Sequence, residues 1–183
     1  MTEDIEQVLF TKEQIAARVA ALGARIHADY AESNLLLVGT LKGAFLFLAD
    51  LARAIDLQLQ VDFVSISSYG DGASSSGAIQ IRKDLDRSPA GFDVLIVEDI
   101  VDSGRTLAYL QDNLCAQRAA SIEICTLFDK PSGRVVPVIP KYTGFTVPDG
   151  FIVGYGMDYA EKYRSLPFVG LLRPEIYGEK QRP

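Results

Sequence analysis

Short apolar runs alternate with helix-like segments along most of the chain, and this alternation limits the fold more than any other feature. The run "LLLVGT" (35–40) precedes a mostly apolar helical segment at 44–55, and "DVLIVEDI" (93–100) precedes a second one at 105–118. Strands that alternate with helices form parallel sheets, whose crossover helices cover the two faces. The sequence therefore predicts an α/β fold with a mainly parallel, twisted sheet flanked by helices.

The remaining segments complete this outline. Thr11 and Gln14 have the spacing of a capping box before a helical apolar period, which predicts an amphipathic helix of about four turns. The strands expected at 59–67 and 78–85 are joined by "SYGDGASSSG" (68–77), and this arrangement predicts an antiparallel hairpin with a long mobile loop. Further strands are expected at 121–130, 151–156 and 168–172, and the Pro-rich segment 131–150 is expected to fold over the sheet as a flap.

Length and composition exclude several classes of protein. The 183 residues fit one domain, 1–183, and the net charge of −6 argues against nucleic-acid and membrane partners. No apolar stretch approaches the ~20 residues that span a bilayer. Cys115 and Cys125 have neither disulfide nor metal spacing, so reduced thiols in a cytoplasmic compartment are expected. His27, the only histidine, lies in a polar helical segment and is expected at the surface rather than in a catalytic site.

Acidic, glycine and hydroxyl residues meet where the strand at 93–100 ends. Glu98 and Asp99 close this strand, and Asp102 stands just before the next helix. Backbone N–H groups at a helix N-terminus bind anions, so a phosphate suits this turn, and the acids could hold a sugar diol or a metal ion through water. An acidic turn with a simple N-cap would explain these residues singly, whereas their combination favours a phosphorylated ribose. The turn itself consists of Ser103, Gly104, Arg105 and Thr106.

The stretch "VEDIVDSGRT" (97–106) resembles the phosphoribosyl-diphosphate motif of the type I phosphoribosyltransferases, in which two acids precede a D-[ST]-G-x-T turn. The similarity extends from about residue 35 to 172 and is closest to bacterial hypoxanthine-guanine phosphoribosyltransferases. It implies a type I phosphoribosyltransferase fold with a flexible hairpin lid and a small hood from the N-terminal segment and about 131–183. The other matching motifs are "LKG" (41–43), "SSYG" (67–70), "FDK" (128–130) and "FIVGYGMDYAEKYRSL" (151–166).

The resemblance implies a role for each matching residue around the base. Asp102 matches a general base near the imidazole edge of a purine. Lys130 matches a donor to the 6-keto oxygen, and such a donor would leave the amino group of adenine unpaired at a cost of ~1–3 kcal/mol. Phe151 would stack on the purine, Ile152 would offer backbone groups to its edge, and Asp158 would lie beside the base.

The resemblance also implies a binding set for phosphoribosyl diphosphate. Leu41–Lys42 matches a non-proline cis peptide, and Arg164 matches a cation that contacts pyrophosphate. Glu98 and Asp99 match acids that hold the ribose hydroxyls directly or through Mg²⁺, and Asp158 matches a ligand of a second Mg²⁺. The implied set is Leu41, Lys42, Gly43, Ser68, Tyr69, Glu98, Asp99, Ser103, Gly104, Arg105, Thr106 and Arg164.

The expected activity is transfer of 5-phosphoribosyl from 5-phospho-α-D-ribose 1-diphosphate to hypoxanthine or guanine, with Mg²⁺, giving IMP or GMP and pyrophosphate. The resemblance also implies a homodimer or homotetramer. Three alternatives stay open: another acceptor base (xanthine, adenine or a pyrimidine), a non-catalytic nucleotide-sensing regulator, and a receiver domain like those that open on "VLIVED". A regulator that binds nucleic acid would need a basic face, which the net charge of −6 does not favour.

Overall fold

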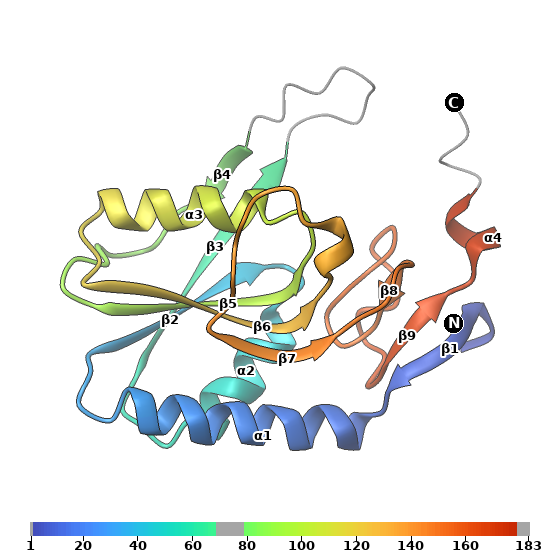
Figure 1. Ribbon diagram of the computed structural model, residues 1–183, viewed down its shortest axis with the longest axis horizontal. Coiled ribbons are helices and arrows are strands. Elements are labelled where there is room, and N and C mark those ends of the chain that lie inside the picture. Colours follow the sequence, from blue (N-terminus) through green and yellow to red (C-terminus); the bar gives the residue numbers. More distant parts are fainter. Residues whose placement is uncertain (1, 69–78, 179–183) are drawn as a thin grey trace.

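The computed structural model describes residues 2–68 and 79–178 and contains a six-stranded main sheet (Figure 1). Its strand order is β4-β3-β2-β5-β6-β7, and only the edge strand β4 runs antiparallel to its neighbour. The expected α/β fold with a mainly parallel sheet is confirmed. The strands are β2 (Leu35–Leu41), β3 (Gln60–Ser68), β4 (Ile79–Lys83), β5 (Asp93–Val101), β6 (Ser121–Asp129) and β7 (Tyr142–Thr146).

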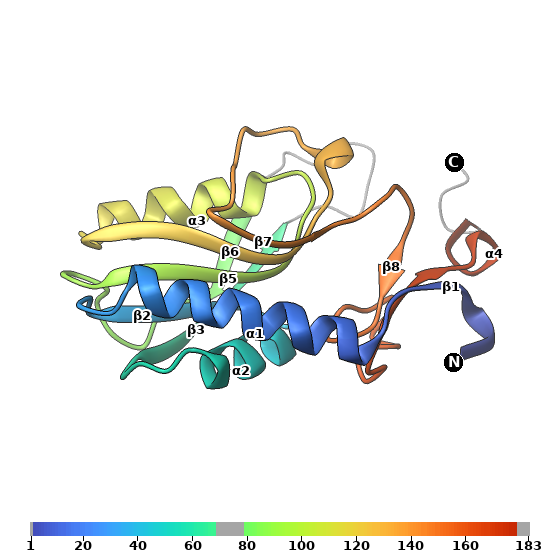
Figure 2. The same ribbon diagram turned by 60° about the horizontal axis from the view of Figure 1, so that its bottom comes forward.

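Helices cover both faces of this sheet, as Figures 1 and 2 show. Helices α1 (Lys12–Asp29) and α2 (Phe45–Ala54) lie on one face, and α3 (Arg105–Ala116) lies on the other. Because both faces are covered, the central strands are apolar at nearly every position, and β2 is buried from Leu35 to Thr40. The capping box of Thr11 and Gln14 is present at the start of α1.

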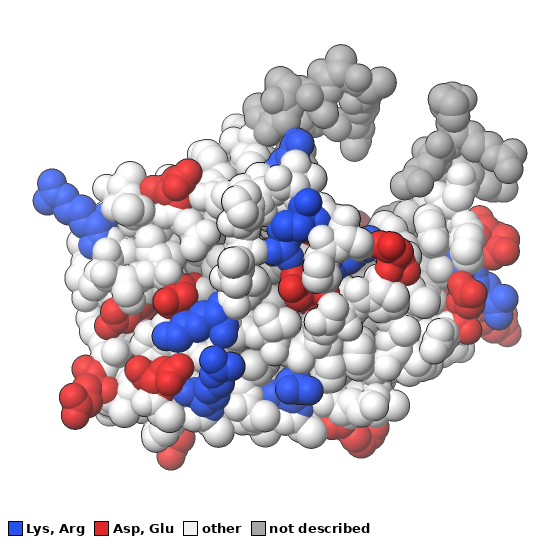
Figure 3. Space-filling model, in the orientation of Figure 1, with Lys and Arg blue, Asp and Glu red and all other residues white. Residues whose placement is uncertain are grey.

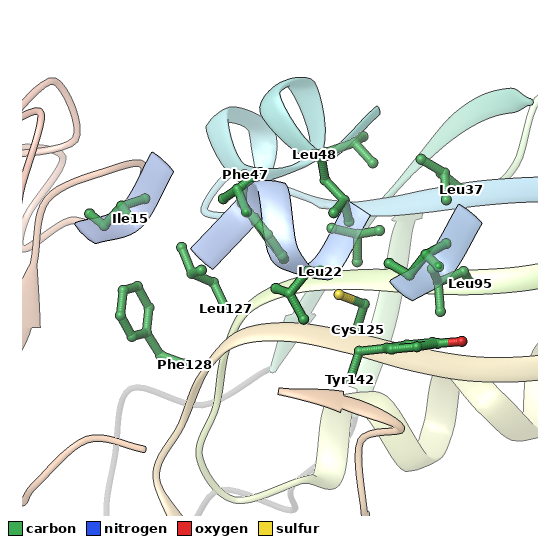
Figure 4. Close-up of a cluster of buried hydrophobic side chains, with 14 of the residues drawn as sticks. Ile15, Leu22, Leu37, Phe47, Leu48, Leu95, Cys125, Leu127, Phe128 and Tyr142 are labelled. Carbon is green, nitrogen blue, oxygen red and sulfur yellow. The ribbon is translucent and has the colours of Figure 1, made fainter. Parts of the chain in front are cut away.

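Neighbouring residues of the central strands enter two separate cores. Leu37 and Leu95 point toward α1 and α2, in the core drawn in Figure 4. Leu36 and Ile96 point to the other face and pack against α3. This alternation follows from the two-residue period of a strand. The parallel pairing of β2 with β5, from Leu35 opposite Asp93 to Gly39 opposite Val97, places the carboxyl ends of these two strands side by side.

A second, three-stranded sheet lies at the carboxyl end of the main sheet and is called the hood here. It consists of β1 (Ile5–Phe10), β9 (Val169–Leu172) and β8 (Ile152–Val153), in that order. Ile5 pairs with Leu172, so the two ends of the chain are joined in one antiparallel ladder. Short helical turns flank the hood and the main sheet: η1 (Thr2–Asp4), η2 (Pro131–Gly133) and α4 (Pro174–Tyr177).

The structure corrects the sequence-based outline in three places. Residues 142–146, which were assigned to a flap and to the hood, form β7 at the edge of the main sheet, where they pair with β6 and where Tyr142 and Gly144 are buried. Strand β1 was not expected. The strand expected at 151–156 ends at Val153, because Gly154 and Gly156 adopt φ values of 104° and 100°, which leave the strand conformation.

The structure also tests the expected hairpin and the expected lack of a membrane-spanning segment. The antiparallel pairing of β3 with β4 is confirmed, whereas the loop between them, including Tyr69, lies outside the described residues. Within the described part of the chain, none of the helices is long and apolar enough to cross a membrane.

Candidate active site

Two adjoining cavities open at the carboxyl ends of β2 and β5. The larger, of about 340 Å³, is called the cationic cavity, and the smaller, of about 260 Å³, is called the turn cavity. Ligands of open α/β sheets bind beyond the carboxyl ends of the strands, so this pair is the candidate active site. Gly43, Asp99, Ile100 and Asp102 line both cavities. The cationic cavity adds Lys42, Lys130, Gly150, Phe151, Ile152, Met157, Asp158 and Arg164, and the turn cavity adds Thr40, Leu41, Ile66, Glu98, Val101, Ser103, Gly104, Thr106 and Leu107.

Most of the predicted site residues therefore meet in one place. The side chain of Arg105 is exposed and lines neither cavity, which agrees with a contribution through its backbone alone. Ser68 ends β3 and Tyr69 follows it, but the side chain of Ser68 and all of Tyr69 lie outside the described residues. The expected closing of this loop over the site stays a prediction.

The turn between β5 and α3 presents backbone N–H groups to the turn cavity. Gly104 is the N-cap of α3, adopts φ 80° and has no side chain to cap the helix, and the Ser103 hydroxyl oxygen accepts only a long hydrogen bond, of 3.4 Å, from the N–H of Arg105. A Cβ atom at Gly104 would lie 2.8 Å from the carbonyl oxygen of Val136, so a larger residue does not fit. The first N–H groups of a helix have no partner within it. Beside the hydroxyl groups of Ser103 and Thr106, these groups form a site for an anion.

Glu98 lies at the inner wall of the turn cavity, and its carboxylate faces Thr40. The Thr40 hydroxyl donates to Glu98 Oε1 at 2.6 Å, and the backbone N–H of Asp99 donates to the same oxygen at 3.3 Å. Burial, and next the charge of Asp99, raise the pKa of the Glu98 carboxyl well above its ordinary value. No sequence pattern singles out Thr40, because a threonine inside an apolar run is an ordinary strand residue.

Replacing Glu98 by glutamine should stabilise the protein in a pH-dependent way. Because the native pKa of Glu98 lies above the unfolded value, its contribution to stability is complete below the unfolded pKa and is lost as the pH rises through the native pKa. Glutamine stays neutral throughout. We expect the Tm of the Glu98→Gln protein to exceed that of the wild type by about 2–4 °C near pH 8, which is the effect of about 1 kcal/mol in a domain of this size.

A thermal melting series in the absence of ligands measures this difference, which should shrink as the pH falls toward 5. Glu32→Gln is the matched control, because Glu32 is exposed in the turn between α1 and β2, at the opposite end of the sheet. A Tm difference for Glu98→Gln that does not change with pH would contradict the role of the buried carboxyl.

Asp99 and Gly43 are in close contact where the two cavities meet. A Cβ atom at Gly43 would lie 1.8 Å from Asp99 Oδ2, so glycine leaves the room in which the carboxylate sits. The Leu41–Lys42 peptide is cis, as the sequence resemblance implied. A Cβ atom at Gly156 would lie 2.1 Å from the carbonyl oxygen of Gly43, so the turn after β8 approaches the end of β2 at backbone distance.

Arg134 joins the segment after β6 to the turn that carries Asp102. Its Nε donates to the carbonyl oxygen of Asp102 at 2.9 Å, and its Nη2 donates to that of Val101 at 3.3 Å and pairs with the Asp129 carboxylate. Arg134 and Asp129 are both largely buried. Arg134 therefore fixes the backbone of Asp102 and, through Asp129, the end of β6 just before Lys130. Sequence reasoning did not find this residue, although it stands four positions after Lys130.

The cationic cavity has an apolar wall from the hood. Phe151 packs edge-on against Tyr159, with ring centroids 5.2 Å apart, and is tilted against Tyr177 at 5.5 Å. Ile152 and Met157 are buried beside it. Lys130 Nζ donates to the carbonyl oxygen of Gly150 at 3.3 Å, which holds the ammonium group at the edge of this wall. A flat aromatic ligand with a polar edge would satisfy both features.

The predicted metal ligands do not form one cluster. Glu98 is turned toward Thr40, and Asp158 Oδ1 pairs with Arg164 Nη2 at 2.8 Å. Across residues 2–68 and 79–178 there is no group of three or more His, Cys, Asp or Glu side chains placed to hold a metal ion. Mg²⁺ is commonly bound by one or two carboxylates together with water and substrate phosphates. The carboxylates of Asp99 and Asp158, which both line the cationic cavity, fit that kind of site.

The fold and this site are those of a phosphoribosyltransferase. The family model described as "Phosphoribosyl transferase domain" matches residues 7–160, which include most of β1, every element from α1 to β8, and most of the residues that line the two cavities.

Comparison with individual proteins shows to which family of phosphoribosyltransferases the chain is similar. The hypoxanthine-guanine phosphoribosyltransferase of Bacillus subtilis (strain 168) is 50% identical over 177 residues, which cover 97% of this chain and 98% of that protein. The crystal structure of a hypoxanthine phosphoribosyltransferase from Staphylococcus aureus has a TM-score of 0.93 at 45% identity and covers 97% of this chain and 96% of that one. The chain belongs to the hypoxanthine-guanine phosphoribosyltransferase family of purine-salvage transferases, as the sequence resemblance indicated.

Some relatives are longer. The bifunctional protein TilS/HprT of Listeria innocua is 50% identical over 179 residues, which cover 98% of this chain. The chain spans 28% of the length of that protein.

Proposed function

We propose that this protein transfers the 5-phosphoribosyl group of 5-phospho-α-D-ribose 1-diphosphate to the imidazole nitrogen of hypoxanthine or guanine. The observation that carries the proposal is the meeting of the two cavities at Asp99 and Asp102. On one side lies an uncapped helix N-terminus suited to a phosphate. On the other lie cationic side chains and an apolar wall suited to a pyrophosphate and a purine.

Each part of the substrate pair has a proposed place. The 5′-phosphate binds the turn Ser103–Thr106, and the ribose hydroxyls bind Glu98 and Asp99. The purine stacks on Phe151, with its 6-keto oxygen accepting from Lys130 and its edge next to the backbone of Ile152. The pyrophosphate contacts Lys42 and Arg164. The anomeric carbon then lies between Asp99 and Asp102, where the two cavities join.

The reaction breaks the anomeric C–O bond and makes a cationic sugar and a strongly charged leaving group. Lys42 and Arg164 neutralise the leaving group, and the carboxylates of Glu98 and Asp99 suit the sugar cation. Asp102 takes or relays the proton of the base as its nitrogen attacks the anomeric carbon. Arg134 holds the backbone of Asp102 in place for this step. Placement and electrostatics supply the catalysis, without a covalent enzyme intermediate.

Mg²⁺ is the proposed cofactor. When bound, it would neutralise phosphate charge that the protein, with a net charge of −6, does not neutralise by itself. Asp99 and Asp158 are the residues proposed to hold it, and Glu98 is proposed to contribute through its neighbour Asp99.

An assay with phosphoribosyl diphosphate and Mg²⁺ tests the proposal when hypoxanthine, guanine, xanthine and adenine are offered separately. We expect turnover of hypoxanthine and guanine and at least tenfold lower kcat/KM for adenine, whose amino group leaves Lys130 without an acceptor. Absence of turnover with every purine, while phosphoribosyl diphosphate still binds, would contradict the proposed activity and favour a nucleotide-sensing regulator.

Partners and compartment are also proposals. We propose that the protein works as a homodimer or homotetramer in the cytoplasm, on small-molecule substrates. Cys115 and Cys125 are both unpaired thiols, which suits a reducing compartment. On the face drawn in Figure 3, Lys and Arg side chains lie among Asp and Glu side chains, whereas a nucleic-acid surface gathers basic side chains together.

A further inference from the structure

Glu161, on the turn after β8, is the ion-pair partner of two cations in the cationic cavity. Both of its carboxylate oxygens accept from Lys42 Nζ at 3.2 Å, and Oε2 also accepts from Arg164 Nη2 at 3.4 Å. Within residues 2–68 and 79–178, Lys42 has no other carboxylate partner. Glu161 lies 119 residues from Lys42 in the sequence, so the pair joins the hood to the end of β2.

The backbone places Glu161 at this point. Ala160 and Glu161 adopt φ values of 51° and 61°, so the chain turns sharply here. The N–H of Glu161 donates to Asp158 Oδ2 at 2.8 Å, and Arg164 Nη1 donates to the carbonyl oxygen of Gly156 at 2.8 Å. The hydrogen bond from Lys42 is the main cause that lowers the pKa of the Glu161 carboxyl, so it is charged when it faces the two cations.

The two cations that Glu161 pairs with differ in how firmly they are held. The side chains of Lys42 and Glu161 are 67% and 66% exposed, whereas that of Arg164 is only 21% exposed and also pairs with Asp158. An exposed ion pair contributes little to stability, so a stronger anion can displace Glu161. Pyrophosphate is such an anion, and in the proposed reaction it needs the same Lys42 and Arg164.

We propose that Glu161 is an internal counter-anion, which competes with pyrophosphate for Lys42 and Arg164 and thereby promotes release of this product. The inference rests on the proposed placement of pyrophosphate at these two cations. In the empty site Glu161 neutralises them. During turnover it moves aside for the diphosphate of the substrate, and it returns when pyrophosphate leaves.

Isothermal titration of the protein with pyrophosphate and Mg²⁺ tests this inference. We expect Glu161→Gln to bind pyrophosphate with a Kd about three- to tenfold lower than that of the wild type, because one or two exposed ion pairs no longer compete. The inhibition constant for pyrophosphate in the forward assay should fall by the same factor. High salt should reduce the difference between the two proteins, because screening weakens exposed ion pairs.

Two further variants separate the possible outcomes. Glu32→Gln removes an exposed carboxylate far from the site and should leave the Kd unchanged. Lys42→Gln should weaken pyrophosphate binding. If it does not, or if the wild type fails to bind pyrophosphate, the proposed placement is wrong and the inference falls with it.

If Lys42→Gln weakens pyrophosphate binding but Glu161→Gln binds pyrophosphate as tightly as the wild type or more weakly, the placement of pyrophosphate at Lys42 and Arg164 stands. The proposed competition between Glu161 and pyrophosphate is then overturned. Glu161 would then serve to position Lys42. Because Glu161 is exposed, its replacement should leave the Tm nearly unchanged, and Glu161→Ala repeats the test with a second side chain.

Discussion

Asp102→Asn should lower kcat for hypoxanthine by about 10²–10⁴-fold, which is the usual contribution of a positioned general base. Asparagine has nearly the shape of aspartate but cannot accept the proton of the purine. The Asp102 carboxylate lies beside Gly133, where a Cβ atom would stand 1.6 Å from Oδ1, and the backbone is held by Arg134. These contacts do not depend on the charge of the side chain, so the geometry of the turn should persist. Steady-state kinetics with saturating phosphoribosyl diphosphate measure the loss.

Asp112→Asn is the matched control, because Asp112 is exposed on α3 and lines neither cavity. It should leave kcat and Tm unchanged. The Tm of Asp102→Asn should also stay within about 2 °C of the wild type, as is usual for an exposed side chain. A kcat within about threefold of the wild type would show that Asp102 is not the base.

Lys130 should decide which base the enzyme accepts. Lys130→Met removes the donor for the 6-keto oxygen and should lower kcat/KM for hypoxanthine about 10–100-fold, because an unpaired polar group costs about 1–3 kcal/mol. Lys130→Gln keeps a donor and adds an acceptor. We therefore expect the ratio of kcat/KM for hypoxanthine to that for adenine to fall further in Lys130→Gln than in Lys130→Met. Competition assays with the two bases measure this ratio.

Lys12→Gln provides the control, since Lys12 is exposed at the start of α1. This substitution should change neither kcat/KM for hypoxanthine nor its ratio to kcat/KM for adenine. If Lys130→Met keeps kcat/KM for hypoxanthine within threefold of the wild type, the ammonium group does not contact the base. The contact of Lys130 with the carbonyl oxygen of Gly150 would then be its structural role.

The main sheet could be predicted because its central strands carry their signal locally. The run that became β2 is apolar at nearly every position and β5 carries the buried apolar stretch Val94–Val97, since helices cover both faces of the sheet. The turn Ser103–Thr106 could be predicted for a similar reason, because the acids, the glycine and the hydroxyls are contiguous in the sequence. Neither inference needed a contact between distant segments.

The hood and the support of the site depend on such distant contacts. The segment that became β1 is short, and its partner β9 begins at residue 169. Thr40 meets Glu98 across 58 positions, and Arg134 meets Asp102 across 32. A threonine in an apolar strand and an arginine in a Pro-Ser-Gly-Arg turn give no local sign of these partners. Sequence patterns therefore identified the groups proposed to touch the substrates better than the residues that hold those groups in place.

The ladder between β1 and β9 also sets the order in which the functional surfaces appear during translation. The last strand of the main sheet ends at Thr146, so the sheet and the turn proposed to bind phosphate can form once that residue has left the ribosome. Strand β9, which joins the wall of Phe151 and Ile152, proposed to contact the base, to β1, ends only at Leu172. At a synthesis rate of about 5–20 residues per second, the intervening residues take about 1–5 s. A nascent chain therefore completes the turn proposed to bind a phosphate before it completes the apolar wall proposed to stack on the base.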